Sequence, residues 1–164
     1  MDDNELKQQI IKEASRIEEC CEYSAKAHYN TSKEWNIGNL CLNIPIAIIA
    51  AVVVFIPDEY KTIPAVITAI LAAVQACIKP TDCLKVHKMA GDKYLELKNK
   101  IRRFKNIELE LLTSEEAIKG LDKLASILDG YNSVNPQPSR TGYEKARKGI
   151  QEGEAQYKVD KGIK

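Results

Sequence analysis

The sequence predicts an all-α membrane protein, in which a two-transmembrane helical hairpin joins long cytoplasmic helices that form a coiled-coil-like bundle. Three observations predict this class. Residues 37–56 and 62–78 are apolar runs without a charged side chain. Only the five residues 57–61, Pro-Asp-Glu-Tyr-Lys, separate the two runs. The rest of the 164-residue chain is rich in Lys and Glu, and its apolar residues recur at spacings of three and four, as on amphipathic helices.

The two apolar runs have the dimensions of membrane spans. At about 1.5 Å per residue the first reaches roughly 30 Å and the second roughly 26 Å, close to the thickness of the hydrocarbon layer. Core helices of a soluble bundle are the alternative, but such helices normally keep a polar face, and these runs have almost none. Mostly polar residues precede the first run, so we do not expect a cleavable signal peptide.

The basic residues predict the orientation of the hairpin. Lys26 and Lys33 precede the first run, Lys79 and Lys85 begin a Lys-rich segment after the second, and the turn carries only Lys61 beside two acidic residues. The excess of Lys and Arg on the cytoplasmic side of membrane proteins then places both termini in the cytoplasm and the turn outside. The formal net charge of +1 gives no electrostatic reason to expect a nucleic-acid partner.

The length is that of a single domain, 1–164. Its predicted parts are a cytoplasmic helix (1–36), the first span (37–56), an external turn (57–61), the second span (62–78), cytoplasmic helices (79–150) and a charged tail (151–164). An apolar stripe runs along the N-terminal helix and consists of Leu6, Ile10, Ala14, Ile17, Cys21, Ser24 and His28. A second stripe follows Pro80, with members Ala90, Tyr94, Leu97, Ile101, Phe104 and Leu111.

The second stripe predicts a helix–helix seam in which Tyr94, Leu97, Ile101 and Phe104 pack. Its partner is the N-terminal helix of the same chain or, alternatively, another subunit.

Capping signals predict the last two helices. Thr113 and Glu116 form a capping-box pattern that begins one helix, and Asp129-Gly130 is expected to end it. After a proline-containing loop, Thr141 and Glu144 repeat the pattern and predict a short final helix.

The predicted spans carry polar and small side chains that a simple anchor does not need. Asn39, Asn43 and Ala47 lie on one helical face of the first span, and a face of the second carries Thr68, Ala72 and Gln75. Polar groups in hydrocarbon are expected to meet protein or water, and small residues let helices approach closely. These faces therefore either line a pore between several hairpins or pack helices together without a pore.

Two prolines are candidate hinges. Pro45 interrupts the first span, where a kink is expected because the ring removes a backbone hydrogen bond. Pro80 marks a bend where the second span meets the cytoplasmic helix.

We find no pattern of an enzyme and expect no cofactor and no metal. The phosphate-binding loop and the common hydrolase and metalloprotease motifs are missing from the sequence. His28 and His87 could sense pH or meet lipid headgroups, although packing or solvated roles are more common. Cys83 with His87, or Cys20-Cys21 with His28, are weak zinc candidates, and small buried or interfacial thiols are the favoured interpretation.

The order of elements resembles the SLATT family, which comprises two-transmembrane bacterial effectors that associate with SMODS-type nucleotide synthetases and SLOG nucleotide sensors. The resemblance is carried by SKEWNIGN before the first run, the PDEYK turn, HKMAGDKYLELKNKIRRF after Pro80, and NPQPSRTGYEKARKGI near the end. In the last segment Pro138, Tyr143 and Ala146 match the expected terminal motif. The resemblance extends over nearly the whole chain, and it consists of the order of the elements together with scattered matching residues.

The resemblance implies a membrane-perturbing or pore-forming effector of an anti-phage or conflict system, located in the bacterial inner (plasma) membrane. The implied partners are the lipid bilayer, further copies of the chain, and a nucleotide second-messenger synthetase or sensor. A non-conducting membrane adaptor that clusters a cytoplasmic partner through its helices is the alternative. A holin-like lysis protein is disfavoured because the cytoplasmic half is long and structured.

Overall fold

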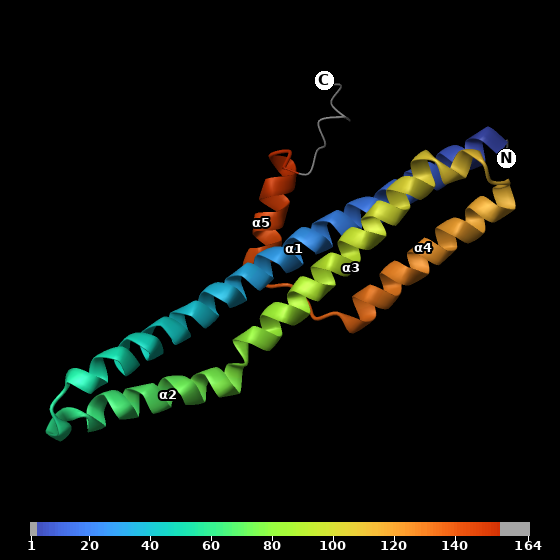
Figure 1. Cartoon of the computed structure of the whole chain (residues 1–164). Helices are drawn as coiled ribbons and strands as arrows, with labels where there is room; N and C mark the ends of the chain where they lie inside the picture. Colours follow the sequence, from blue (N-terminus) through green and yellow to red (C-terminus); the bar gives the residue numbers. More distant parts are fainter. Residues whose placement is uncertain (1–2, 155–164) are drawn as a thin grey trace. The chain divides into compact units, whose positions relative to one another are not determined.

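The computed structural model describes residues 3–154, and every regular element within that range is a helix (Figure 1). The described residues divide into two compact units, the bundle unit (residues 3–31 and 86–154) and the hairpin unit (residues 32–85). Most of the predicted charged tail lies outside the described residues. Helices α1 and α3 each contribute to both units.

Helix α1 runs without a break from Asp3 to Val52. It therefore joins the predicted cytoplasmic helix and most of the first apolar run, and no helix boundary separates them at residue 36. Pro45 lies inside α1, which stays helical on both sides of it. A short 3₁₀ helix, η1 (Val53–Phe55), follows, and Ile56 is extended before Pro57.

The predicted external turn contains a second 3₁₀ helix, η2 (Asp58–Tyr60), in which Lys61 Nζ pairs with Asp58 Oδ1 at 2.6 Å. Helix α2 (Thr62–Ile78) has the bounds predicted for the second apolar run. It ends at Lys79, whose φ of 48° is left-handed, and α3 (Pro80–Asn106) begins at the next residue. The predicted bend at Pro80 thus coincides with a helix break at Lys79.

Two helical stretches, one in each half of the hairpin, are long and apolar enough to cross a membrane, and no residue of either apolar window is buried. Large side chains lie exposed along both, for example Ile48, Phe55, Ile63 and Ile70, each at least 57% exposed. An apolar surface of this extent is unusual for a soluble monomer.

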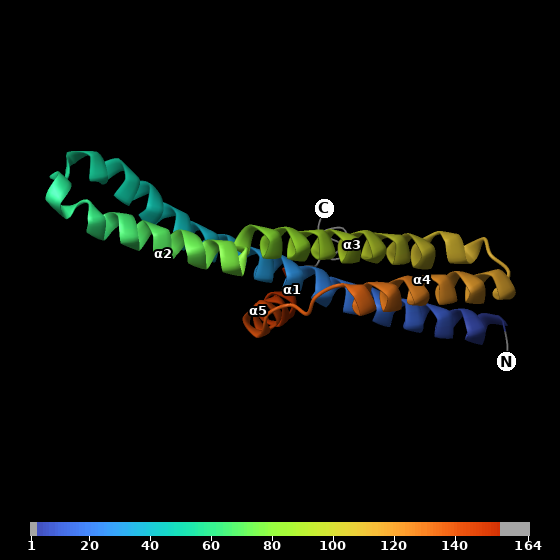
Figure 2. The same cartoon turned by 90° about the horizontal axis from the view of Figure 1, so that it is seen from below.

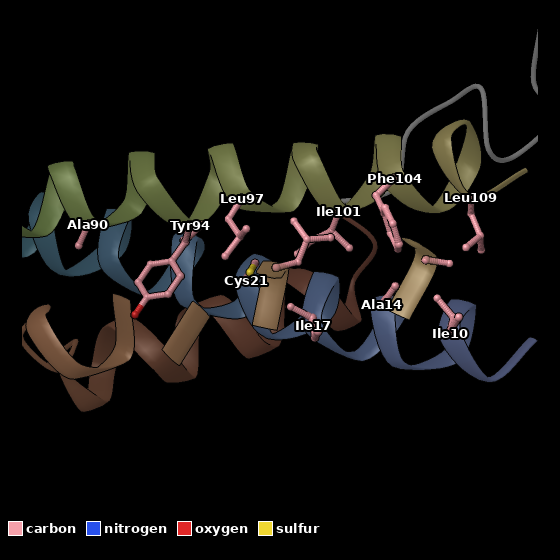
Figure 3. Packing of buried hydrophobic residues seen from close by; sticks show 13 residues of the cluster. Ile10, Ala14, Ile17, Cys21, Ala90, Tyr94, Leu97, Ile101, Phe104 and Leu109 are labelled. Atoms are coloured by element: carbon pink, nitrogen blue, oxygen red, sulfur yellow. The ribbon is translucent and has the colours of Figure 1, made fainter. Parts of the chain in front are cut away.

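The core of the bundle unit lies between α1, α3 and α4 (Ser114–Val134) (Figure 3). All four predicted seam residues are buried, at 3% exposure or less: Tyr94, Leu97, Ile101 and Phe104. They pack against the stripe of α1 from the same chain, including Ile10, Ala14, Ile17 and Cys21. The intrachain pairing of the two predicted stripes is therefore present in the structure.

The end of the second stripe was predicted wrongly. Leu111 is 83% exposed, and Leu109 is buried in the core instead. Helix α3 ends at Asn106 and is followed by the 3₁₀ helix η3 (Glu108–Glu110). A 3₁₀ helix has about three residues per turn, whereas an α-helix has about 3.6. This tighter winding changes which residue faces the core.

Helix α4 begins with the predicted capping box of Thr113 and Glu116. It does not end at Gly130, as the sequence suggested, but continues to Val134. Asn135 is extended, the conformation favoured for a residue that precedes a proline, so Pro136 sets the end.

Helix α5 (Arg140–Gln151) begins one residue after Ser139, which is its N-cap. Ser139 Oγ accepts a hydrogen bond from Gly142 N at 2.9 Å, so the cap predicted at Thr141 is wrong. Figure 2 shows α5 nearly end-on while α4 lies across the view, so the axes of the two helices are steeply inclined to each other.

Candidate functional site

The polar side chains of the hairpin form a chain of hydrogen bonds. Asn43 Nδ2 donates to both Asn39 O and Asn39 Oδ1 at 2.9 Å. Gln75 Nε2, on α2, donates to Asn43 Oδ1, on α1, at 3.1 Å. This bond joins the two helices of the hairpin, and all three side chains are half-buried between them. Such partners are what amide groups require in apolar surroundings.

Thr68 shares the inner face of α2 with Gln75. The half-buried residues of α2 recur at helical spacing, at Pro64, Thr68, Leu71 and Gln75. Asn39, Asn43, Thr68 and Gln75 therefore lie along the seam between the two helices of the hairpin.

The predicted alanines have a different environment. Ala47 and Ala72 are exposed, and Ala72 belongs to a flank of α2 that contains only alanines, namely Ala65, Ala69, Ala72 and Ala76. The opposite flank is mostly bulky, with Ile63, Val66, Ile67, Ile70 and Val74 all exposed. Another helix could approach the alanine flank more closely than the bulky flank.

The only two histidines of the chain meet inside the bundle unit. Nδ1 of His28 and Nδ1 of His87 are 3.0 Å apart, and the rings are 2% and 7% exposed. One Nδ1 must carry a hydrogen and donate the hydrogen bond, and the other Nδ1 must accept that bond through its lone pair. The ring of Tyr94 stacks on His28, with centroids 5.5 Å apart, and its hydroxyl donates to Asn132 Oδ1 at 2.9 Å.

Sequence reasoning singled out both histidines but did not pair them. His28 belongs to the apolar stripe of α1, and His87 precedes Ala90 by one spacing of the α3 stripe. Their position on two facing stripes was the available signal.

Burial determines the protonation of this pair. Burial, with a smaller effect of the charge of His87, lowers the pKa of His28 to about 4. Burial likewise lowers the pKa of His87. Both imidazoles are therefore neutral near pH 7. In this state one ring can donate and the other can accept the hydrogen bond between them.

The candidate zinc ligands are not brought together. Among the described residues no group of three or more His, Cys, Asp or Glu side chains is placed to hold a metal ion. His87 contacts His28, whereas Cys83 Sγ lies 3.8 Å from Ile78 O. Burial, with smaller effects of Cys20 and Glu18, raises the pKa of the Cys21 thiol to about 12, so that thiol is unreactive.

Known proteins give no independent guide to these sites. No protein-family model, curated protein or solved structure matches this chain.

Proposed function

We propose that the chain is a homo-oligomeric effector of the bacterial inner membrane, whose hairpins assemble into a pore that depolarises the membrane. The exposure of the two apolar helices supports the membrane location most directly. A soluble protein would bury helices of this hydropathy, whereas here neither apolar window contains a buried residue. Lipid is the partner that such a surface fits. The basic residues around the hairpin support cytoplasmic termini.

The alanine flank of α2 supports assembly. In lipid, helices associate through close packing of small residues, because there is no hydrophobic gain from leaving lipid. Ala65, Ala69, Ala72 and Ala76 form such a surface, and no part of the hairpin buries it. We propose that this flank joins neighbouring hairpins. One hairpin alone cannot enclose a channel, so several subunits are required.

The trigger follows from the resemblance to SLATT proteins. A nucleotide second-messenger synthetase or a nucleotide sensor would act on the bundle unit and release the hairpins, in an anti-phage or conflict system.

The satisfied polar chain inside the hairpin favours a second candidate, a membrane adaptor that clusters a cytoplasmic partner and conducts nothing. Asn39, Asn43 and Gln75 form hydrogen bonds with one another, so these groups are less available to bind water in a pore. The two candidates differ in what crosses the membrane.

Dye efflux from liposomes that contain the purified protein separates the candidates. The substitution Ala72→Leu adds bulk on the alanine flank, where the hairpin itself packs nothing. We expect it to reduce efflux at least tenfold. The matched control is Cys77→Leu, which adds bulk beside the large residues of the opposite flank and should leave efflux unchanged.

The adaptor candidate predicts no efflux from any of these proteins. The mass of the protein in detergent supplies a second criterion, since a monomer or dimer would exclude a pore lined by hairpins.

A further inference from the structure

The two histidines lie where the chain passes between its units. The chain crosses between the bundle unit and the hairpin unit twice, between Thr31 and Ser32 on α1 and between Lys85 and Val86 on α3. His28 precedes the first crossing by about one helical turn, and His87 directly follows Val86. The hydrogen bond between the imidazoles thus ties α1 to α3 beside both crossings.

We propose that His28 and His87 form a proton-operated latch, which holds α1 and α3 together when neutral and releases them when both imidazoles are protonated. The latch gives the bundle unit a direct response to acid. It rests on the proposed function only for the consequence, since release beside the crossings would act on the hairpin.

The chemistry of two imidazoles makes the release steep. A neutral pair shares one Nδ1–H and one lone pair across 3.0 Å. A first added proton leaves one Nδ1 lone pair, so the hydrogen bond survives. A second proton removes that lone pair and leaves two N–H groups and two positive charges facing each other. The contact cannot persist in that state.

Within residues 3–154 the two rings contact each other and Tyr94, and none of these contacts supplies an anion to the protonated pair. Asp82 and Asp92 are the acidic residues nearest to His87 in sequence, each five positions away, and Asp92 accepts a hydrogen bond from Tyr29 at 2.7 Å. Other titratable or charged groups on the packed elements include Cys21, Lys26, Lys33 and Glu34 on α1, Lys85, Lys88 and Lys93 on α3, Tyr131 on α4, and Glu154 after α5, which pairs with Lys26.

The shift in the equilibrium between the closed and the released latch on acidification can be estimated from His28 alone. A solvated imidazole titrates near 6.5, and burial holds the pKa of His28 at about 4. Moving from about pH 7 to about pH 5 then shifts the balance toward a state with solvated His28 by about twentyfold. His87 shifts the balance in the same direction because burial also lowers its pKa.

Hydrogen–deuterium exchange of the full chain in lipid nanodiscs tests the latch. We expect peptides that cover His28 and His87 to exchange at least tenfold faster at about pH 5 than at about pH 7, after correction for intrinsic rates. In the double variant His28→Gln and His87→Gln this acceleration should disappear, because Gln can donate and accept without titrating. The control Asp92→Asn should retain it.

For each of these exchange experiments, one result would contradict the latch. Equal exchange of the native chain at both pH values would overturn it, and so would an undiminished acceleration in the Gln variant. If the Gln variant does not fold, the nitrogen chemical shifts of the native imidazoles decide, since titration at or above pH 6.5 by both rings contradicts the latch.

Dye efflux separates the latch from the pore. Faster exchange in acid without any efflux supports the latch and counts against the proposed pore. Efflux that rises in acid without a change in exchange supports the pore and overturns the latch.

Discussion

An ion pair inside the bundle unit shows how single residues stabilise this fold. Lys98 Nζ lies 3.1 Å from Glu22 Oε2, and the side chains are only 8% and 19% exposed. The second oxygen, Glu22 Oε1, is buried and has no hydrogen-bond partner among the described residues. The pair thus links α3 to α1, but it leaves part of the desolvation penalty of the carboxylate uncompensated.

Replacing one partner of this pair is expected to be worse than replacing both. Lys98→Met leaves Glu22 buried without its cation and should destabilise the protein by about 3 kcal/mol. The double variant Lys98→Met and Glu22→Leu should recover most of that loss. Thermal unfolding in detergent, followed by circular dichroism, measures both. A double variant as unstable as the single one would show that the lost charge pairing is not the cause.

The hydrogen bond between Gln75 and Asn43 gives a second residue-scale prediction. Gln75→Leu removes the bond that joins the two hairpin helices and leaves Asn43 Oδ1 without this donor. We expect a loss of about 0.6–2 kcal/mol in detergent or lipid. Cys77→Leu, on the exposed bulky flank, serves as the comparison and should lose less. Equal stability of the two variants would contradict a role for the bond.

The pairing of the two histidines could not be predicted from the sequence for a physical reason. Periodicity fixes which face of a helix a residue occupies, but not which residue of another helix lies opposite. His28 and His87 are 59 residues apart, and their contact depends on the axial alignment of α1 and α3. The same limit explains why the sequence did not show that Asn43 is half-buried whereas Ala47, one turn later on the same face, is exposed. A helical wheel does not say which sector faces α2.

At the scale of elements, the docking of α5 depends on small residues. Gly142, Ala146 and Gly149 are buried. A Cβ at Gly142 would lie 2.9 Å from the backbone oxygen of Ala27, and Asn30 Nδ2 donates to Gly142 O at 3.1 Å. Helix α5 therefore approaches the backbone of α1 as closely as glycine allows.

Gly142→Ala is expected to displace α5, because the neighbouring backbone cannot yield cheaply. Trypsin should then cleave α5 at Arg140, Lys145 or Arg147 several-fold faster than in the native protein. The matched control is Gly130→Ala inside α4, where a Cβ would meet nothing within 4 Å. That change should stabilise the protein by about 0.5–1 kcal/mol. Unchanged proteolysis of Gly142→Ala would show that the contact is dispensable.

Local signals predicted some elements well and failed where tertiary contacts prevailed. The bounds of α2 and the capping box of Thr113 followed from local sequence. Gly130 failed as a helix end because glycine costs a helix only about 1 kcal/mol. The residues beyond it pack on the core, where Tyr131 meets the ring of Tyr94 edge-on.

The whole molecule is expected to have both termini on one side of the membrane. In a variant that keeps one cysteine at a time, native Cys20 should react with a membrane-impermeant maleimide only after the cells are permeabilised. A cysteine introduced by Glu59→Cys, in the turn, should react in intact cells. Both positions are exposed, so a difference in labelling reports sidedness. The reverse pattern would contradict the predicted orientation.

The neutral histidine pair has a consequence for a whole cell. Protons that enter through a leaking membrane acidify the compartment in which the imidazoles would lie. If acid releases further copies of the chain, each leak promotes the next, and the response becomes self-amplifying. Because release requires two protons per subunit, the transition would have a threshold rather than a gradual onset. In the proposed pore, two buried imidazoles would thereby sustain the response once the first assemblies open.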